Sequence, residues 1–325
     1  MEFRKRNKCI ILFYTLILIV TTSFITHAEN DKKLSIIEMR MEATVCIGVV
    51  VNVQPKNSKI SKKSFRPIGT GVIIGIPEDP KKRLCLVTAK HVFEDPSKKW
   101  YPHIVNLRFA WHQHLALEEY NGIPVRIRDE QNKFWYEHPK ADLASIPLII
   151  SSDLVGKKTV KAVLTSQFLE PNDLSVGQPV IVLGFPGAVR VSLGSSFMTL
   201  PLARRGIISW LPSSEQMPRA ILVDTMAFPG NSGGPVFNMP RTWDKYGNQI
   251  KKPQPTAFIG IVSKAALQPV DIRAVEVRDK SKEFVKPLSL DYMGLTQIEP
   301  ADRVKELLNI VKEKILKETK QSHVK

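Results

Sequence analysis

The sequence predicts an all-β fold made of many short strands, with a single helix at the C-terminal end. Short runs rich in Val and Ile recur along the chain, and Gly, Pro or charged residues bound most of them. Such runs are typical of strands in β-sandwiches and β-barrels. Long helical periodicity is missing until the end of the chain. The predicted strands are Thr44–Val53, Gly71–Ile76, Leu84–Thr88, Ile104–Phe109, Val125–Arg128, Asp142–Leu148, Val180–Phe185, Gly206–Trp210, Ala220–Asp224, Pro235–Phe237 and Ala257–Ser263.

The end of the chain has a different pattern. Pro300 stands where a first helical residue would, which suits a proline. Apolar residues then recur at helical spacing, which predicts an amphipathic helix that docks on the body of the protein. These residues are Val304, Leu307, Leu308, Val311 and Ile315. Between the predicted strands, the polar stretches Asn238–Pro255 and Ala265–Leu288 are expected to be surface loops.

The first 28 residues have the layout of a secretory signal peptide. Basic residues open the chain, an uncharged stretch covers Cys9–Ile25, and Thr26-His27-Ala28 offers small residues at a cleavage site. The stretch is also long enough for a membrane anchor, so a membrane association is expected only if it is not cleaved. Cleavage is favoured, and we expect an exported protein that is periplasmic or extracellular.

Charge distribution and cysteine content indicate which partners and cofactors the protein can have. The 325 residues carry a formal charge of +16, but the basic residues are scattered and no aromatic residues interleave with them. We therefore expect solvated surface loops and no nucleic-acid groove. Cys46 and Cys85 remain after signal removal, and either one disulfide or two buried thiols is open. No Cys/His group has metal-ligand spacing, and we expect no cofactor.

The segment Pro229–Pro235, with the sequence PGNSGGP, carries the strongest chemical signal. A nucleophilic serine needs open backbone around it and N–H groups free to bind a developing oxyanion. Glycines on both sides of Ser232 meet both needs. The segment also fits the nucleophile elbow of α/β-hydrolases, in which a histidine follows the serine. Only His323 follows here, in a polar tail, so a catalytic triad would take its His and Asp from upstream.

Two upstream residues fit the remaining roles. His91 follows an apolar run at a strand end, where a general base can be held rigidly and still face a cleft. Asp142 enters an apolar segment, which is costly unless the carboxylate is paired. Pairing with an imidazole would satisfy it and fix the tautomer of the histidine. This context is missing around the other upstream histidines, which are His103, His112, His114 and His138.

Three blocks of the sequence resemble the signature blocks of chymotrypsin-fold (trypsin-like) serine proteases, in that family's order. They are Thr88–His91, Asp142–Ala144 and Gly230–Pro235. Five flanking blocks resemble the bacterial high-temperature-requirement (HtrA-like) branch, namely Gly69–Ile74, Gly184–Gly187, Gly206–Ser209, Val223–Thr225 and Tyr292–Leu295. That branch often carries a PDZ domain after the protease. Only a helix and a tail follow residue 300 here, so no PDZ domain is expected.

The resemblance implies a protease domain at about 40–315 with two packed six-stranded antiparallel β-barrels. The first barrel would span about 40–150, the second about 175–298 and the helix about 300–317. It implies His91 as the base, Asp142 as its orienting acid and Ser232 as the nucleophile. The backbone N–H groups of Gly230 and Ser232 would bind the oxyanion.

The expected partners are polypeptide substrates, which would add an antiparallel strand along Ile261–Lys264. Self-association into a homo-oligomer also fits the HtrA-like resemblance. The alternative function is a protease-like scaffold that binds polypeptides without cutting them. Loss of a triad residue would favour that alternative, and no triad residue is lost.

Overall fold

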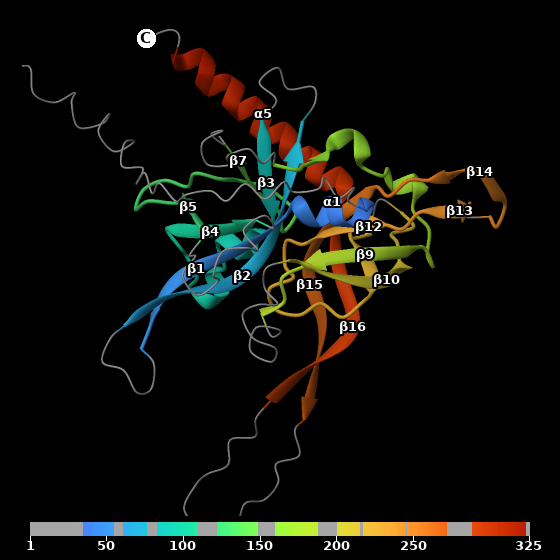
Figure 1. Cartoon of the computed structure of the whole chain (residues 1–325), viewed down its shortest axis with the longest axis horizontal. Coiled ribbons are helices and arrows are strands. Elements are labelled where there is room, and N and C mark those ends of the chain that lie inside the picture. The colour runs from blue at the N-terminus through green and yellow to red at the C-terminus, as the bar shows by residue number, and fades with distance from the viewer. Residues whose placement is uncertain are drawn as a thin grey trace, which may run out of the picture. The chain divides into compact units, whose positions relative to one another are not determined.

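The computed structural model describes residues 35–54, 61–76, 83–109, 122–148, 160–187, 200–214, 217–244, 246–271 and 288–322. Strands in these residues form two large sheets and one small hairpin (Figure 1), which confirms the predicted all-β class. The predicted signal peptide lies outside the described residues. Within them, no helix is long and apolar enough to cross a membrane. The α-helices are α1 (Ile36–Glu42), α2 (Lys90–Phe93) and α5 (Ala301–Ser322), and 3₁₀ helices cover Pro96–Lys98, Thr165–Gln167 and Pro171–Asp173.

The first sheet contains eight strands, with the order β5-β4-β1-β2-β3-β7-β6 and with β8 paired to β2. All pairings are antiparallel except the one between β2 and β8. The resemblance implies a six-stranded barrel here, but the described strands form a curled half-barrel sheet, in which β6 and β8 have only two residues each. The bounds are β1 (Thr44–Val53), β2 (Lys62–Gly75), β3 (Leu84–Thr88), β4 (Ile104–Phe109), β5 (Ile123–Arg126), β6 (Tyr136–Glu137), β7 (Ala144–Leu148) and β8 (Val163–Leu164).

The second sheet closes into a barrel of six strands, with the order β10-β11-β16-β15-β12-β9. Residues at alternate positions of a strand face the same side, and Val180 and Val182 of β9 both enter the barrel core. Val223 and Ile298 join them from β11 and β16. The bounds are β9 (Pro179–Gly184), β10 (Leu202–Trp210), β11 (Ile221–Asp224), β12 (Pro235–Asn238), β15 (Phe258–Asp271) and β16 (Leu288–Pro300).

Two stretches that the sequence predicts to be loops contain strands. β15 continues to Asp271 and pairs with β16 as far as Leu288, so Ala265–Leu288 is partly a long hairpin. Residues 272–287 lie outside the described residues. Asn238–Pro255 contains the hairpin of β13 (Arg241–Trp243) and β14 (Gln249–Gln254). Backbone hydrogen bonds form these ladders, so the polar composition that predicted loops did not prevent strand pairing.

The helix α1 was not predicted, although the sequence contains its capping signal. Ser35 Oγ accepts a hydrogen bond from the Glu38 N–H, and the Glu38 carboxylate accepts one from the Ser35 N–H. This reciprocal pair is a capping box, which satisfies two N–H groups at the helix start. Arg40 at the other end is buried and donates hydrogen bonds to Gln167 Oε1 and to the Thr256 carbonyl oxygen.

The C-terminal helix α5 begins one residue after the predicted Pro300 and runs to Ser322. Its apolar face is buried, with Val304 and Leu307 fully inaccessible to solvent. The same core cluster includes Val72, Ile74 and Val87 of the first sheet and Leu183, Phe237 and Ile261 of the second. The helix therefore docks on the body of the protein, as its amphipathic pattern predicted, and it does so where the two sheets meet (Figure 1).

The open question about the cysteines is answered by the strand order. Cys46 lies on β1 and Cys85 on β3, and β2 separates these strands in the sheet. Both residues are buried thiols rather than a disulfide. They pack as small apolar side chains, which was one of the two alternatives.

We predict that Leu307→Ala lowers the free energy of unfolding by about 2–5 kcal/mol, because it opens a cavity in a fully buried position. Leu316, on the same helix, is 46% exposed and supplies the control. Leu316→Ala should change stability by less than about 0.5 kcal/mol. Urea denaturation measures both. Equal effects of the two variants would show that α5 does not dock through its apolar face.

Candidate active site

Adjacent strand ends bring His91 and Asp142 together. His91 lies on α2, directly after β3, and Asp142 lies in the loop that enters β7. β3 and β7 are paired through Thr88 and Ala144, so the two side chains leave the sheet at neighbouring points. Asp142 Oδ2 lies 2.7 Å from His91 Nδ1, and Asp142 Oδ1 accepts the His91 backbone N–H at 3.1 Å. Because Nδ1 donates to the carboxylate, the Nε2 atom of a neutral ring carries the lone pair that a general base needs.

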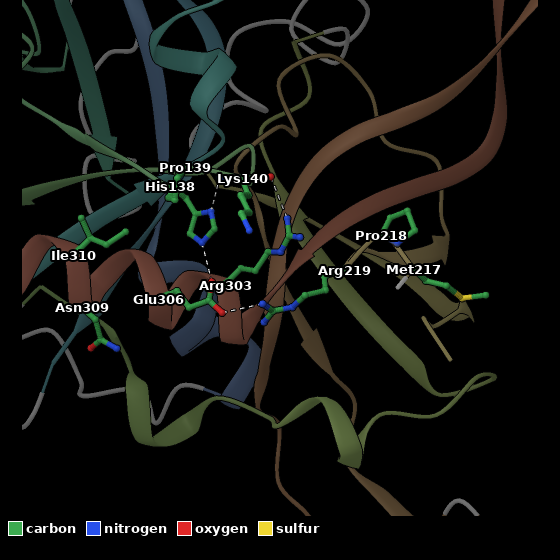
Figure 2. A pocket seen from close by; sticks show the side chains of 10 residues that line it. All are labelled: His138, Pro139, Lys140, Met217, Pro218, Arg219, Arg303, Glu306, Asn309 and Ile310. Carbon is green, nitrogen blue, oxygen red and sulfur yellow. Dashed lines mark hydrogen bonds and ion pairs between the residues drawn. The ribbon is translucent and has the colours of Figure 1, made fainter. Parts of the chain in front are cut away.

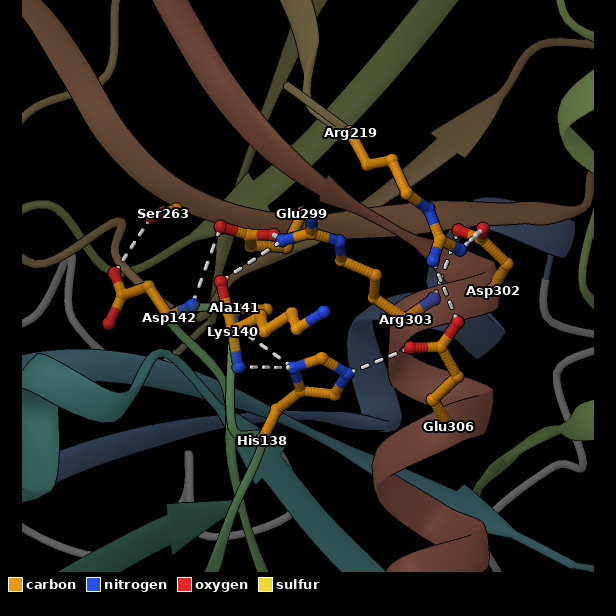
Figure 3. Close-up of polar contacts among 10 residues, drawn as sticks. All are labelled: His138, Lys140, Ala141, Asp142, Arg219, Ser263, Glu299, Asp302, Arg303 and Glu306. Carbon is orange, nitrogen blue, oxygen red and sulfur yellow. Dashed lines mark hydrogen bonds and ion pairs between the residues drawn. The ribbon is translucent and has the colours of Figure 1, made fainter. Parts of the chain in front are cut away.

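Sequence reasoning missed Ser263, which is a second partner of this carboxylate beside His91. Its Oγ donates a hydrogen bond to Asp142 Oδ2 at 2.7 Å (Figure 3), and the side chain is buried. Ser263 comes from β15 of the barrel, so it connects the barrel to an acid that stands next to β7 of the first sheet. Its only sequence signal was a polar residue at the end of a buried apolar run.

These contacts set the charge state of Asp142. Burial acts to raise the pKa of Asp142, but the hydrogen bond and charge of His91 and the hydrogen bond from Ser263 outweigh it. The net result is a pKa of Asp142 below its ordinary value. The carboxylate is therefore ionised at neutral pH and can stabilise a cationic His91.

Thr70 on β2 fastens the loop that carries Ser232 to the strand that precedes His91. The Thr70 N–H donates to the Ser232 carbonyl oxygen at 2.8 Å, and Thr70 Oγ1 donates to the Gly230 carbonyl oxygen at 2.7 Å. The same Oγ1 accepts the Phe185 N–H at 3.0 Å. On its other side, the Thr70 carbonyl oxygen accepts Thr88 Oγ1 at 2.6 Å. Thr70 is fully buried, so water does not compete for these bonds.

The residue after Ser232 shows how closely the two segments approach. A Cβ atom added to Gly233 would lie 2.1 Å from Thr88 Oγ1 and 3.0 Å from the Ala89 backbone nitrogen. Gly233 also has a φ of +84°, which L side chains rarely adopt. Only glycine fits between the serine and the segment that leads to His91. Among the described residues, however, no hydrogen bond joins Ser232 to His91.

A tight turn sets the direction of the Gly230 N–H. The Asn231 N–H donates to the Phe228 carbonyl oxygen at 2.9 Å and closes a four-residue turn. Pro229 occupies its second position and Gly230, with a φ of +100°, its third, which defines a type II turn. The Pro229 carbonyl oxygen accepts the Gly187 N–H at 2.9 Å. In a trans peptide the N–H is opposite the C=O, so the Gly230 N–H points away from Gly187.

The second predicted oxyanion donor has the same arrangement. The Asn231 carbonyl oxygen accepts the Gly234 N–H at 2.8 Å, so the Ser232 N–H of that peptide points the other way. Within the described residues, neither the Gly230 N–H nor the Ser232 N–H donates to a protein acceptor. Two unoccupied backbone donors next to a serine are what an oxyanion site requires.

Of the rival histidines that the structure describes, neither the exposed His103 nor His138 belongs to this cluster. His112 and His114 lie outside the described residues, and His138 is buried against Glu306. His138 and Glu306 border a cavity of about 760 Å³ (Figure 2), which contains none of the predicted triad residues. In the part of the chain that the structure describes, no group of three or more His, Cys, Asp or Glu could hold a metal ion.

We predict that Thr70→Val destabilises the protein by about 1–3 kcal/mol relative to Thr70→Ser, because Val leaves the Gly230 carbonyl and the Phe185 N–H without their buried partner. Val has nearly the volume of Thr, whereas Thr70→Ser keeps the hydroxyl and removes a methyl group, so it shows the effect of lost packing alone. Denaturant unfolding compares the two variants. Equal stabilities of the two variants would show that the Thr70 hydroxyl does not hold the serine loop in place.

We also predict that Asp142→Asn costs stability in a pH-dependent manner. Native contacts lower the pKa of Asp142, so its carboxylate stabilises the fold above its unfolded pKa of about 4. That contribution is lost as the pH falls through the native pKa. The stability difference between parent and variant should therefore be constant near neutral pH and shrink in acid. Urea denaturation across a pH series measures it, with the exposed Glu130→Gln as control, and a difference that persists in acid would contradict the prediction.

Comparison with known proteins gives the family. A family model described as a trypsin-like peptidase domain matches residues 69–244, which is more than half of the chain and includes His91, Asp142 and Ser232. No curated protein sequence matches the chain.

Similar solved structures include the HtrA-type protease AlgW with a decapeptide, at 14% identity and a TM-score of 0.47, with 85% of this chain and 66% of that chain covered. A serine-to-alanine form of AlgW with a tripeptide matches at 16% identity and a TM-score of 0.43, with 84% and 61% covered. The chain thus spans less than two thirds of the length of these structures. On the match to the family model, the chain belongs to the trypsin-like peptidase domain family.

Proposed function

We propose that this protein is a serine endopeptidase. Ser232 Oγ attacks the peptide carbonyl while His91 Nε2 accepts its proton, and His91 then returns the proton to the leaving amine. Asp142 holds the imidazole in the required tautomer and stabilises its cationic form. The Gly230 and Ser232 N–H groups bind the oxyanion. Water then hydrolyses the acyl-enzyme, again with His91 as base, and no cofactor enters these steps.

One observation carries the proposal. An ionised, partly buried Asp142 lies 2.7 Å from His91 Nδ1, and Thr70 on the neighbouring strand β2 holds the Ser232 loop. A histidine with a purely structural role does not need a charged partner of this kind. It also does not need a nearby serine loop with two unoccupied backbone N–H groups, those of Gly230 and Ser232. This convergence is the arrangement that acyl transfer requires.

The edge of β15 supports a polypeptide substrate. The sequence predicted strand addition along Ile261–Lys264, but Ile261 is paired with Pro235 of β12. Val262 exchanges hydrogen bonds with the segment of Gly233 and Gly234. Among the described residues, the edge is therefore open only from Ser263 onward. We propose that a substrate strand pairs with this open part of β15, which begins at Ser263, the residue that donates a hydrogen bond to Asp142.

The absence of a Ser232–His91 hydrogen bond in the described residues is the observation that favours the alternative, a polypeptide-binding protein that does not cut. Such a bond is often long in enzymes without substrate and tightens when substrate binds. The complete set of triad residues therefore favours the peptidase. The N-terminal signal pattern supports the further proposal that the enzyme acts after export, outside the cytoplasm.

We predict that a fluorophosphonate probe labels the protein and that Ser232→Ala abolishes both labelling and peptide cleavage while leaving the fold intact. The reason is that the probe reacts only with an activated serine. The control is Ser213→Ala, which changes an exposed serine outside the Pro229–Pro235 motif and should label normally. Gel fluorescence and mass spectrometry of the labelled peptide give the result. A folded parent that resists labelling would favour the binding protein, and labelling retained in Ser232→Ala would refute Ser232 as nucleophile.

A further inference from the structure

The loop between β6 and β7 carries Asp142, and the helix α5 holds this loop through His138 (Figure 3). His138 is buried, and its Nδ1 accepts the backbone N–H groups of Lys140 at 3.1 Å and Ala141 at 2.9 Å. Its Nε2 lies 2.9 Å from Glu306 Oε2. A ring nitrogen that accepts hydrogen bonds carries no proton, so Nε2–H is the donor to Glu306. His138 thus links two backbone groups of the loop to α5.

A second connection comes from the junction of β16 and α5. Glu299 Oε1 accepts the Asp142 backbone N–H at 3.4 Å. Arg303 Nη1 donates to Glu299 Oε2 at 3.2 Å and to the Lys140 carbonyl oxygen at 3.3 Å. The Glu299 side chain is only 5% exposed and that of Arg303 15%. A buried ion pair therefore contacts the backbone on both sides of Ala141.

Arg219, from the segment before β11, contacts the first turns of α5. It forms ion pairs with Asp302 and, at 2.9 Å, with Glu306. The cavity in Figure 2 borders His138, Arg219 and Glu306. Since this space is open beside the His138–Glu306 contact, truncation of Glu306 leaves His138 Nε2 facing the cavity.

We propose that His138, Glu299, Arg303 and Glu306 are positioning residues for the catalytic acid. They hold the backbone on which Asp142 stands, and Asp142 in turn orients His91 through two hydrogen bonds of 2.7 and 3.1 Å. A misplacement of about 1 Å can cost about 100-fold in rate, so these contacts control turnover from outside the cleft. The inference rests on the proposed peptidase function and goes beyond it by giving α5 a role in the chemistry.

The kinetic test compares truncated and conservative variants with a peptide substrate. Glu306→Ala and His138→Ala should lower kcat about 10- to 100-fold and change KM less than about twofold, because the substrate edge on β15 is untouched. Glu306→Gln keeps an oxygen for His138 Nε2–H, and His138→Asn keeps an acceptor for the loop N–H groups. Both should retain more kcat than the corresponding alanine variants. Equal kcat in parent and alanine variants, or no rescue by the conservative ones, would overturn the proposal.

A proton NMR measurement gives a readout that needs no turnover. The His91 Nδ1–H in its short bond to Asp142 should give a resonance far downfield in the Ser232→Ala protein, and Asp142→Asn should remove it. Glu306→Ala should shift or broaden this resonance, and Lys305→Ala should not. Lys305 is the matched control because it lies on α5 in an exposed ion pair with Glu170.

Fold is checked by circular dichroism melting. If Glu306→Ala does not fold, His138→Ala takes its place, and His138→Asn is its conservative counterpart. A resonance unchanged in every variant of His138 and Glu306 overturns the positioning role. A parent that shows the resonance but neither labels nor turns over substrate refutes the peptidase function instead, and the resonance alone then decides on the positioning of Asp142.

Discussion

The site depends on one buried threonine. Thr70 uses its N–H, its hydroxyl and its carbonyl group to connect the serine loop of the second barrel with the strand that leads to His91. Each buried hydrogen bond contributes about 1 kcal/mol net, but breaking one leaves an unsatisfied group that costs about 1–3 kcal/mol. The serine loop therefore cannot slide relative to the first barrel at low cost. The two sheets are rigid, and the hydrogen bonds of Thr70 fix the position of the Ser232 loop relative to them.

The sequence allowed the prediction of residues whose function has a local signature. Gly-flanked Ser232 and the strand-end His91 are of this kind, and so is the helix α5, whose apolar spacing is visible directly. Ser263 and the strand β16 were missed. A serine after an apolar run looks like a strand end. β16 begins after a charged stretch of the sequence, and backbone hydrogen bonds pair the strand itself with β15. What a residue contacts across the fold leaves no pattern in its neighbours along the chain.

The buried carboxylate of Glu299 and the partly buried carboxylate of Asp142 have opposite electrostatic environments. Burial raises the pKa of Glu299, and the nearby Asp142 charge adds to this, while Arg303 and the Asp142 N–H act against it. The pKa of Asp142 is lowered because His91 and Ser263 outweigh burial. The contacts at Asp142 thus favour its charged form, which faces the imidazole, while burial disfavours the charged form of Glu299. Two fully ionised acids here without Arg303 would repel each other, so the ion pair makes the catalytic arrangement compatible with a buried Glu299.

The helix α5 connects the packing of the core with the position of the Asp142 loop. Its apolar face, with Val304, Leu307 and Leu308, completes the core shared by both sheets. The ion-pairing residues Arg303 and Glu306 alternate with these positions along the first turns, so packing of the apolar face also sets their distance from the Asp142 loop. The apolar face and the ion-pairing face lie side by side on the same helix, so a shift of one face also shifts the other. Core packing and alignment of the acid are therefore coupled through a single rigid element.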